Sequence, residues 1–256
     1  MTTDSPSARK ILIPIDYYGV SRASLETLVH IAGPLHRGVL GLLLEDLRLQ
    51  QVADLPFTTE ITLHGCEERS LQREQLSRRH SLVSTDTGRL LKELASRDRV
   101  DLVLEQVAGN RLRAALTRDA GLDIFFPARQ RWQQLPVKRS AQRKAIARLG
   151  IVLAQTAQDH AIVETAGLLQ KAGLVGETYV ISTGALDRAQ LNSLYQPGSR
   201  ICVQANLHSD PATIGRLIRQ SPYDLLLLPR DCLQGIAPEA LEAALDKASG
   251  QVLVIN

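Results

Sequence analysis

The segment Lys10–Asp16, with the sequence KILIPID, decides the fold of this chain. It is a short apolar run that stops at a break, which is the pattern of a strand buried on both faces. Ser21–His36 then places leucine, isoleucine and alanine at helical spacing, with Ser21 as the expected N-cap. Gly38–Leu44 is apolar throughout and predicts a second buried strand. Strand, helix and strand in this order indicate a parallel α/β sheet with helices on both faces.

The same alternation continues to the end of the chain. In the first half it predicts the strands Thr58–Leu63, Val100–Leu104 and Leu122–Phe126 and the helices Cys66–Arg97 (with a break around Ser84–Gly88) and Asn110–Asp119. In the second half it predicts the strands Leu149–Ala154, Glu177–Ser182, Arg200–Gln204, Asp224–Leu228 and Gln251–Ile255 and the helices Asp159–Ala172, Pro211–Gln220 and Pro238–Ala248.

The two halves repeat one order of elements. Leu25–Thr27 falls on Val163–Thr165, and the same offset places Gly38 on Gly176. At a smaller offset, the apolar run VDLVL at Val100 matches YDLLL in the second half. Internal duplication explains these matches better than a chance likeness of two α/β halves.

The duplication predicts two domains, residues 1–127 and 146–256, joined by a basic linker at 128–145. No acidic residue occurs between Asp123 and Asp159, whereas arginine and lysine recur there. The linker fits either a patch for phosphate or another acidic partner, or a solvated spacer. The spacer is favoured, because Trp132 alone offers a stacking face for nucleic acid.

The composition is that of a globular protein. Of 256 residues, 44% are hydrophobic and 4% aromatic, so aliphatic side chains fill the core. A net charge of +3 is too small for a dedicated nucleic-acid binder. Cys66, Cys202 and Cys232 form no disulfide framework, which favours a reducing compartment. With neither a signal peptide nor a membrane-spanning run, we expect a cytoplasmic protein with no membrane partner.

The order of elements, with Pro14-Ile15-Asp16 at the end of the first strand, resembles the universal stress protein family. The resemblance covers nearly the whole chain, twice. It implies two tandem five-stranded parallel-sheet domains of the Rossmann-like, adenine nucleotide alpha hydrolase-like fold. It also implies that Leu122–Phe126 and Gln251–Ile255 pair within the chain as a pseudo-dimer, and that two chains form a homodimer.

Members of this family that bind ATP carry a glycine motif after the fourth strand: Gly-x-x-Gly, nine residues, then Gly-Ser or Gly-Thr. Glycine lets the backbone approach phosphates, and the next helix N-terminus supplies amide donors. In the first half this register starts at Gln106, keeps Gly109 and ends on Asp119-Ala120. A carboxylate and a missing hydroxyl disfavour a triphosphate there. Pro14, Ile15, Asp16 and Gly109 are therefore the remnant of a nucleotide site.

The second half retains none of the motif. Its register reads Pro229, Cys232 and then Glu242-Ala243, and Ala154 stands where the first half has Asp16. The resemblance thus implies a protein that requires no cofactor. ATP and AMP are the ligands that it leaves as alternatives.

The other groups of residues that could form a metal or catalytic site are weak candidates. His64 and Cys66 lie two residues apart with His80 beyond, but a metal site needs a second ligand pair, so no metal is expected. There is no P-loop and no nucleophile elbow, and we assign no catalytic residue.

The segment Glu45–Glu60 fits either a partner surface or ordinary packing over the sheet edge. Three functions follow in order of preference. The first is a non-enzymatic stress or regulatory factor, the second a nucleotide-binding or nucleotide-hydrolysing protein using Asp16 and Gly109, and the third an interaction module.

Overall fold

The computed structural model describes residues 9–16, 19–45, 51–61, 65–118, 121–129, 144–184, 192, 194–195, 200–205, 208 and 210–256. The first half contains β1 (Lys10–Ile15), α1 (Arg22–Ala32), β2 (Gly38–Glu45), β3 (Thr59–Ile61), β4 (Glu68–Ser70), α3 (Arg73–Arg97), β5 (Leu102–Ala108), α4 (Arg111–Leu116) and β6 (Asp123–Phe126). The second half contains β7 (Ile146–Leu153), α5 (Asp159–Lys171), β8 (Val175–Ser182), β9 (Arg200–Ala205), α7 (Pro211–Gln220), β10 (Leu225–Pro229), the 3₁₀ helix η1 (Arg230–Leu233), α8 (Pro238–Lys247) and β11 (Gln251–Ile255).

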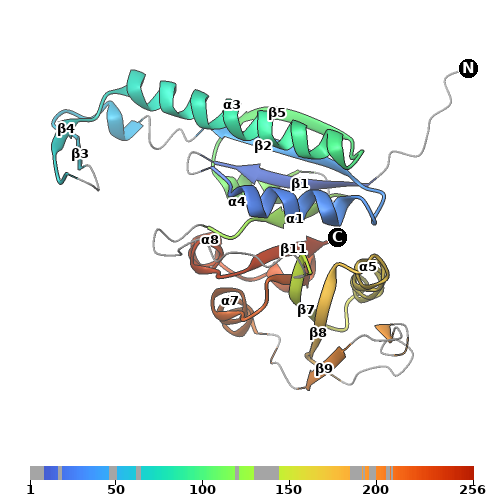
Figure 1. The fold of residues 1–256 in the computed structure, drawn as a ribbon. Helices are drawn as coiled ribbons and strands as arrows, with labels where there is room; N and C mark the ends of the chain where they lie inside the picture. The colour runs from blue at the N-terminus through green and yellow to red at the C-terminus, as the bar shows by residue number, and fades with distance from the viewer. Residues whose placement is uncertain are drawn as a thin grey trace, which may run out of the picture.

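One sheet runs through both halves (Figure 1). Within the described residues it has nine strands in the order β5-β2-β1-β6-β11-β10-β7-β8-β9. All neighbouring strands are parallel except β6 and β11, which pair antiparallel where the two halves meet. The predicted fold class, a tandem α/β protein with parallel strands inside each half, is confirmed. Across the described residues, no helix has the length and apolarity to span a bilayer.

The two halves are not equal. The second half has the five-stranded order β9-β8-β7-β10-β11, whereas the described first half gives four strands to the sheet rather than the five expected. The expected strand Thr58–Leu63 is shorter, β3, and pairs with β4 in a separate hairpin. Most of its side chains and all of those in β4 are exposed, so the hairpin is not packed into the core.

The alignment of Val100–Leu104 with the second half is also corrected by the strand order. β5 pairs with β2 and forms the outer edge of the sheet, whereas β10 pairs with β7, the first strand of its half. The strand that takes the corresponding place beside β1 is β6. Both VDLVL and YDLLL are apolar runs that suit a sheet, so their composition alone could not tell the two positions apart.

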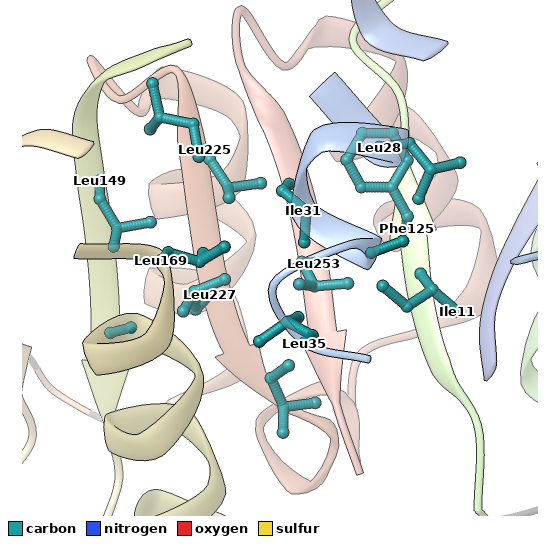
Figure 2. Packing of buried hydrophobic residues seen from close by; sticks show 14 of the residues in the cluster. Ile11, Leu28, Ile31, Leu35, Phe125, Leu149, Leu169, Leu225, Leu227 and Leu253 are labelled. Atoms are coloured by element: carbon teal, nitrogen blue, oxygen red, sulfur yellow. The ribbon is translucent and has the colours of Figure 1, made fainter. Parts of the chain in front are cut away.

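The core is continuous across the junction of the halves. On one face of the sheet, Ile11 and Phe125 of the first half belong to the same buried cluster as Leu225 and Leu253 of the second (Figure 2). On the other face, Phe126 shares a cluster with residues of α8 and β11. The halves therefore bury apolar surface against each other and not only within themselves.

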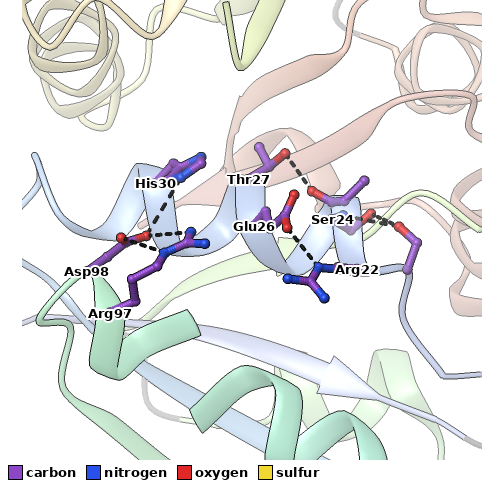
Figure 3. Close-up of polar contacts among 9 residues, drawn as sticks. Arg22, Ser24, Glu26, Thr27, His30, Arg97 and Asp98 are labelled. Carbon is purple, nitrogen blue, oxygen red and sulfur yellow. Dashed lines mark hydrogen bonds and ion pairs between the residues drawn. The ribbon is translucent and has the colours of Figure 1, made fainter. Parts of the chain in front are cut away.

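Local signals predict the helices well, with two exceptions, both in the helix expected over Cys66–Arg97. Its first residues are not helical, because Glu68–Ser70 form β4 and α3 begins at Arg73. Ser21 caps α1 as predicted, since its Oγ accepts a hydrogen bond from Ser24 N at 3.1 Å. Figure 3 shows Ser24 in the first turn of α1 and the ion pair of Arg22 with Glu26 on the same helix. The expected break at Ser84–Gly88 is absent: α3 is continuous, and a Cβ on Gly88 would lie 3.3 Å from Leu104, so this glycine serves close packing on β5. Asp159 is the first residue of α5, as predicted.

A buried ion pair holds one end of the junction. Asp123, the first residue of β6, is 2% exposed and pairs with Arg37. Its Oδ1 also accepts a hydrogen bond from the backbone N of Asn256, the residue after β11, at 3.1 Å. Burial lowers the pKa of Arg37, and the nearby charge of Arg9 adds to this. The carboxylate thus ties the start of β6 to the end of β11.

We expect Asp123→Ala to lower the free energy of unfolding by about 3–5 kcal/mol, because it leaves a buried guanidinium without its counter-charge. Urea unfolding followed by circular dichroism measures this. Asp86→Ala, which breaks the exposed pair between Asp86 and Arg89, is the matched control and should change little. Equal effects of the two substitutions would contradict a special role for Asp123.

Candidate functional site

The natural place for a ligand in the first half is the carboxyl end of β1 and β6. In open parallel sheets, ligands bind beyond the carboxyl ends of the strands, where the strand order reverses. The order reverses here at β1, whose neighbours β2 and β6 lie on opposite sides. Asp16 follows β1, and Arg129 lies three residues after the end of β6. These two side chains define the site.

The structure separates the residues predicted for the nucleotide site. Pro14 and Ile15 are buried inside β1, paired with β2, and Asp16 stands at the strand end. Gly109 follows β5, and its N donates to the backbone oxygen of Glu45 at 3.0 Å. Because β2 lies between β1 and β5, Asp16 and Gly109 end strands that are two strand spacings apart, about 10 Å.

The glycine register is wrong because it follows a strand that does not lie beside β1. The strand beside β1 is β6, and the residues that follow it are Pro127, Ala128 and Arg129, without a glycine. Gly109 has a φ of +138°, and a Cβ added to it would have no heavy atom within 4 Å, so a turn conformation accounts for this glycine. Asp119 and Ala120, the last positions of that register, lie outside the described residues.

Four charged side chains meet at the end of β1 and β6, and we call them the seam cluster: Asp16, Arg111, Arg129 and Asp246. Arg129 reaches Asp16 through NH2 at 2.8 Å and Asp246 through Nε at 2.8 Å. Arg111 NH2 lies 2.9 Å from the same Asp246 oxygen. Asp246 belongs to α8, so the seam cluster joins the second half to the ligand position of the first half.

The surroundings of Arg111 explain how the seam cluster is held. Asn110 caps α4, with its Oδ1 accepting from the backbone N of Leu112 and Arg113. The same side chain donates through Nδ2 to Glu242 of α8 at 2.8 Å. Arg111 is 5% exposed, and its guanidinium lies 5.9 Å from the centre of the Phe126 ring. Burial lowers the pKa of Arg111, and the charge of Arg129 adds to this.

The charge balance at this place is unfavourable for a polyphosphate. Among the residues that the structure describes, the guanidinium groups of Arg111 and Arg129 face the carboxylates of Asp16, Asp246 and Glu242. An incoming triphosphate would compete with these carboxylates for Arg111 and Arg129, and would bring further negative charge next to them. The arrangement therefore works as a structural tie between α4 and α8.

Sequence reasoning found Asp16 but missed its partners. Arg129 falls in the basic linker, most of which, residues 130–143, lies outside the described residues. One available signal was Glu242 and Asp246, which stand four residues apart and share one face of α8. Their partners come from positions more than one hundred residues away, and no local pattern shows this.

The corresponding end of β7 in the second half is filled by its own side chains. The carboxylate of Asp159 accepts from the backbone N of Ala154 at 3.2 Å and of Gln155 at 2.9 Å, and from Thr156 Oγ1 at 3.1 Å. Gln155 has a φ of +58°, and its side chain packs directly against Gly184. The buried carboxylate thus closes the loop in which the first half has Asp16.

The other candidates stay isolated. Among the residues that the structure describes, no three histidine, cysteine or acidic side chains converge as a metal site would require. His64 lies outside the described residues, and the side chain of His80 is not described. Cys66 and Cys202 are exposed free thiols.

Comparison with known proteins gives the following. No family model matches the chain, and no curated protein matches it. Among solved structures, the chain is similar to a universal stress protein from Archaeoglobus fulgidus, at 11% identity over 95% of each chain and a TM-score of 0.46. It is also similar to a functionally unknown protein from Pseudomonas aeruginosa, at 13% identity over 97% of this chain and 92% of the other, with a TM-score of 0.43.

The three thiols should differ sharply in reactivity. Burial raises the pKa of Cys232 to about 11, so its thiolate fraction at pH 8 is about 100-fold below that of a thiol with the ordinary value of 9.0. We expect a disulfide reagent at pH 8 to label Cys66 and Cys202 quickly in the folded protein and Cys232 only after unfolding. Peptide mass mapping of the labelled sites checks this, and rapid labelling of Cys232 would contradict its burial.

The seam cluster should contribute to stability through Asp246. Asp246→Asn removes the charge shared by two guanidinium groups, and we expect a loss of about 1–3 kcal/mol in the free energy of unfolding. Glu239→Gln, an exposed substitution on the same helix, is the control and should have a smaller effect. If both variants unfold at the same urea concentration as the unsubstituted chain, the seam cluster is not a structural tie.

Proposed function

We propose that the protein is a non-enzymatic, universal-stress-like regulatory or binding protein that binds adenine nucleotides weakly or not at all. The observation that supports this most directly is the ion pair between Arg129 and Asp16, which engages the one carboxylate left from the family's site. A nucleotide at this position would have to displace Arg129 from both Asp16 and Asp246.

The chemistry of the seam cluster also favours a binding role over catalysis. Guanidinium groups stay protonated in proteins, so Arg111 and Arg129 are not proton acceptors. Asp16 and Asp246 each pair with Arg129 at 2.8 Å, so both carboxylates are engaged in ion pairs within the chain.

We place the protein in the cytoplasm and expect a protein partner. Cys66 and Cys202 are exposed and free, a state that a reducing compartment preserves. The basic linker remains a proposed contact for an acidic partner, although residues 130–143 lie outside the described residues.

A second function has one observation in its favour. Arg111 Nε is buried and has no hydrogen-bond partner among the described residues. A nucleotide phosphate that displaced Asp246 would find in Arg111 and Arg129 two guanidinium donors in place of the glycine motif. The alternative is thus an adenine-nucleotide-binding protein with an altered pocket in the first half.

Thermal unfolding with ATP, ADP, AMP and adenosine, with and without Mg²⁺, separates these two functions. A ligand present at 100 times its dissociation constant would stabilise the folded protein by about 2.7 kcal/mol. We expect no shift with any of the four. A shift with ATP that disappears in Arg111→Met, but persists in the exposed control Arg113→Met, would establish the alternative.

A further inference from the structure

An arm extends from the first half away from the sheet. We define it as residues 51–61 and 65–83, which include the β3–β4 hairpin and the N-terminal part of α3. Figure 1 shows α3 running past the end of the sheet, with the hairpin at its far end. The C-terminal part of α3 is anchored, because Leu91 and Leu94 are buried in the core. The arm itself extends beyond the sheet and covers little of it.

Five large apolar side chains of the arm face solvent. Their exposed fractions are 99% for Phe57, 70% for Ile61, 65% for Leu82, 58% for Leu55 and 42% for Val52. Single exposed apolar residues are normal on a protein surface, but a group on one projecting element marks an interaction site. Packing over the sheet edge, one of the two roles considered for this segment, is therefore excluded for Val52, Leu55 and Phe57.

The arm is an ordered unit with its own internal ties. Thr58 Oγ1 donates to the backbone oxygens of Val52 at 3.0 Å and Leu55 at 3.1 Å. Arg73 NH1 lies 3.1 Å from Asp54, which fastens the hairpin side of the arm to α3. Phe57 is held outward with a φ of +68°, a conformation that is costly for a bulky residue. The local structure thus presents the aromatic ring to solvent.

The charges of the arm are compatible with contact between the arms of two identical chains. The arm carries residues of both signs: acidic ones at Asp54, Glu60, Glu67, Glu68 and Glu74, and basic ones at Arg69, Arg73, Arg78 and Arg79. Such a mixture does not attract nucleic acid or anionic lipid, which require an excess of positive charge. A patch that carries both signs around apolar residues can match itself across a two-fold axis, as a symmetric dimer requires.

The closing strands of the two halves are not available for contact with a second chain. β6 and β11 pair with each other inside the chain, so the closing strands are not free to pair with another chain. A standard interface takes about 20–30 residues from each partner, which is the size of the arm. We propose that two copies of this chain dimerise arm to arm around a two-fold axis, with Phe57 and Ile61 of each copy buried at the centre.

Sedimentation velocity over a concentration series tests the apolar part of this proposal. We expect the unsubstituted chain to form a dimer, and Phe57→Asp with Ile61→Asp to raise the dissociation constant at least tenfold. Tyr195→Asp is the matched control, because Tyr195 is 58% exposed but lies outside the arm. Circular dichroism establishes that each variant is folded. A monomer at all concentrations, or a dimer unaffected by the arm variant, would overturn the proposal; the second result would point to the edge strands β5 or β9.

Charge reversal tests whether the partner is a second copy. One variant carries Arg69→Glu and Arg78→Glu, and the other carries Glu67→Arg and Glu74→Arg. Both break the same two ion pairs within the arm, Arg69 with Glu67 and Arg78 with Glu74, so they are matched for internal damage. Each variant alone should dimerise weakly through like-charge repulsion, and an equimolar mixture should recover the dimer. A mixture that stays as weak as its components would rule out the arm-to-arm arrangement.

Discussion

The antiparallel pairing of β6 with β11 is the constraint on which the rest of the structure depends. Three residue pairs define it, with Ile124 opposite Val254, Phe125 opposite Leu253 and Phe126 opposite Val252. Side chains alternate between the faces of a sheet, so Phe125 and Phe126 enter different core clusters. A slip of one residue would turn every side chain of β6 to the opposite face of the sheet and would disrupt both clusters. Asp123 fixes the register at one end of β6, and the seam cluster fixes it at the other.

This pairing decides what lies over the ligand position of the first half. Because β11 runs antiparallel to β6, the end of α8 that precedes β11 comes to lie beside the carboxyl end of β6. Asp246 and Glu242 arrive there with α8 and meet Arg129, Arg111 and Asn110. The junction of the halves and the nucleotide position therefore occupy the same space. Stability of the junction and an open phosphate cradle are competing uses of these side chains.

The sequence predicted what depends on short-range pattern. The strand KILIPID, the helix capped by Ser21 and the parallel α/β class follow from periodicity and capping, and the structure has all of them. The position of β5 at the edge of the sheet could not be predicted from the sequence, because VDLVL is as apolar as the strands that lie inside the sheet. Strand order is set by pairing between distant segments, and here Thr59–Ile61 pairs with β4 in a separate hairpin while β5 pairs with β2. Asp16 was found from its motif, whereas Arg129 and Asp246 become partners only when the halves meet.

The two halves differ in the number of strands that they give to the sheet and in the surface that they expose. The second half has a complete five-stranded sheet, and its loop at the end of β7 is closed by Asp159. The first half has one strand fewer in the described sheet and a 25-residue helix, α3, whose N-terminal part leaves the core. Both ligand positions are occupied by side chains of the chain itself, while the arm exposes the apolar surface that the core does not use. In the dimer proposed above, this exposed apolar surface of the arm is where one chain contacts the other.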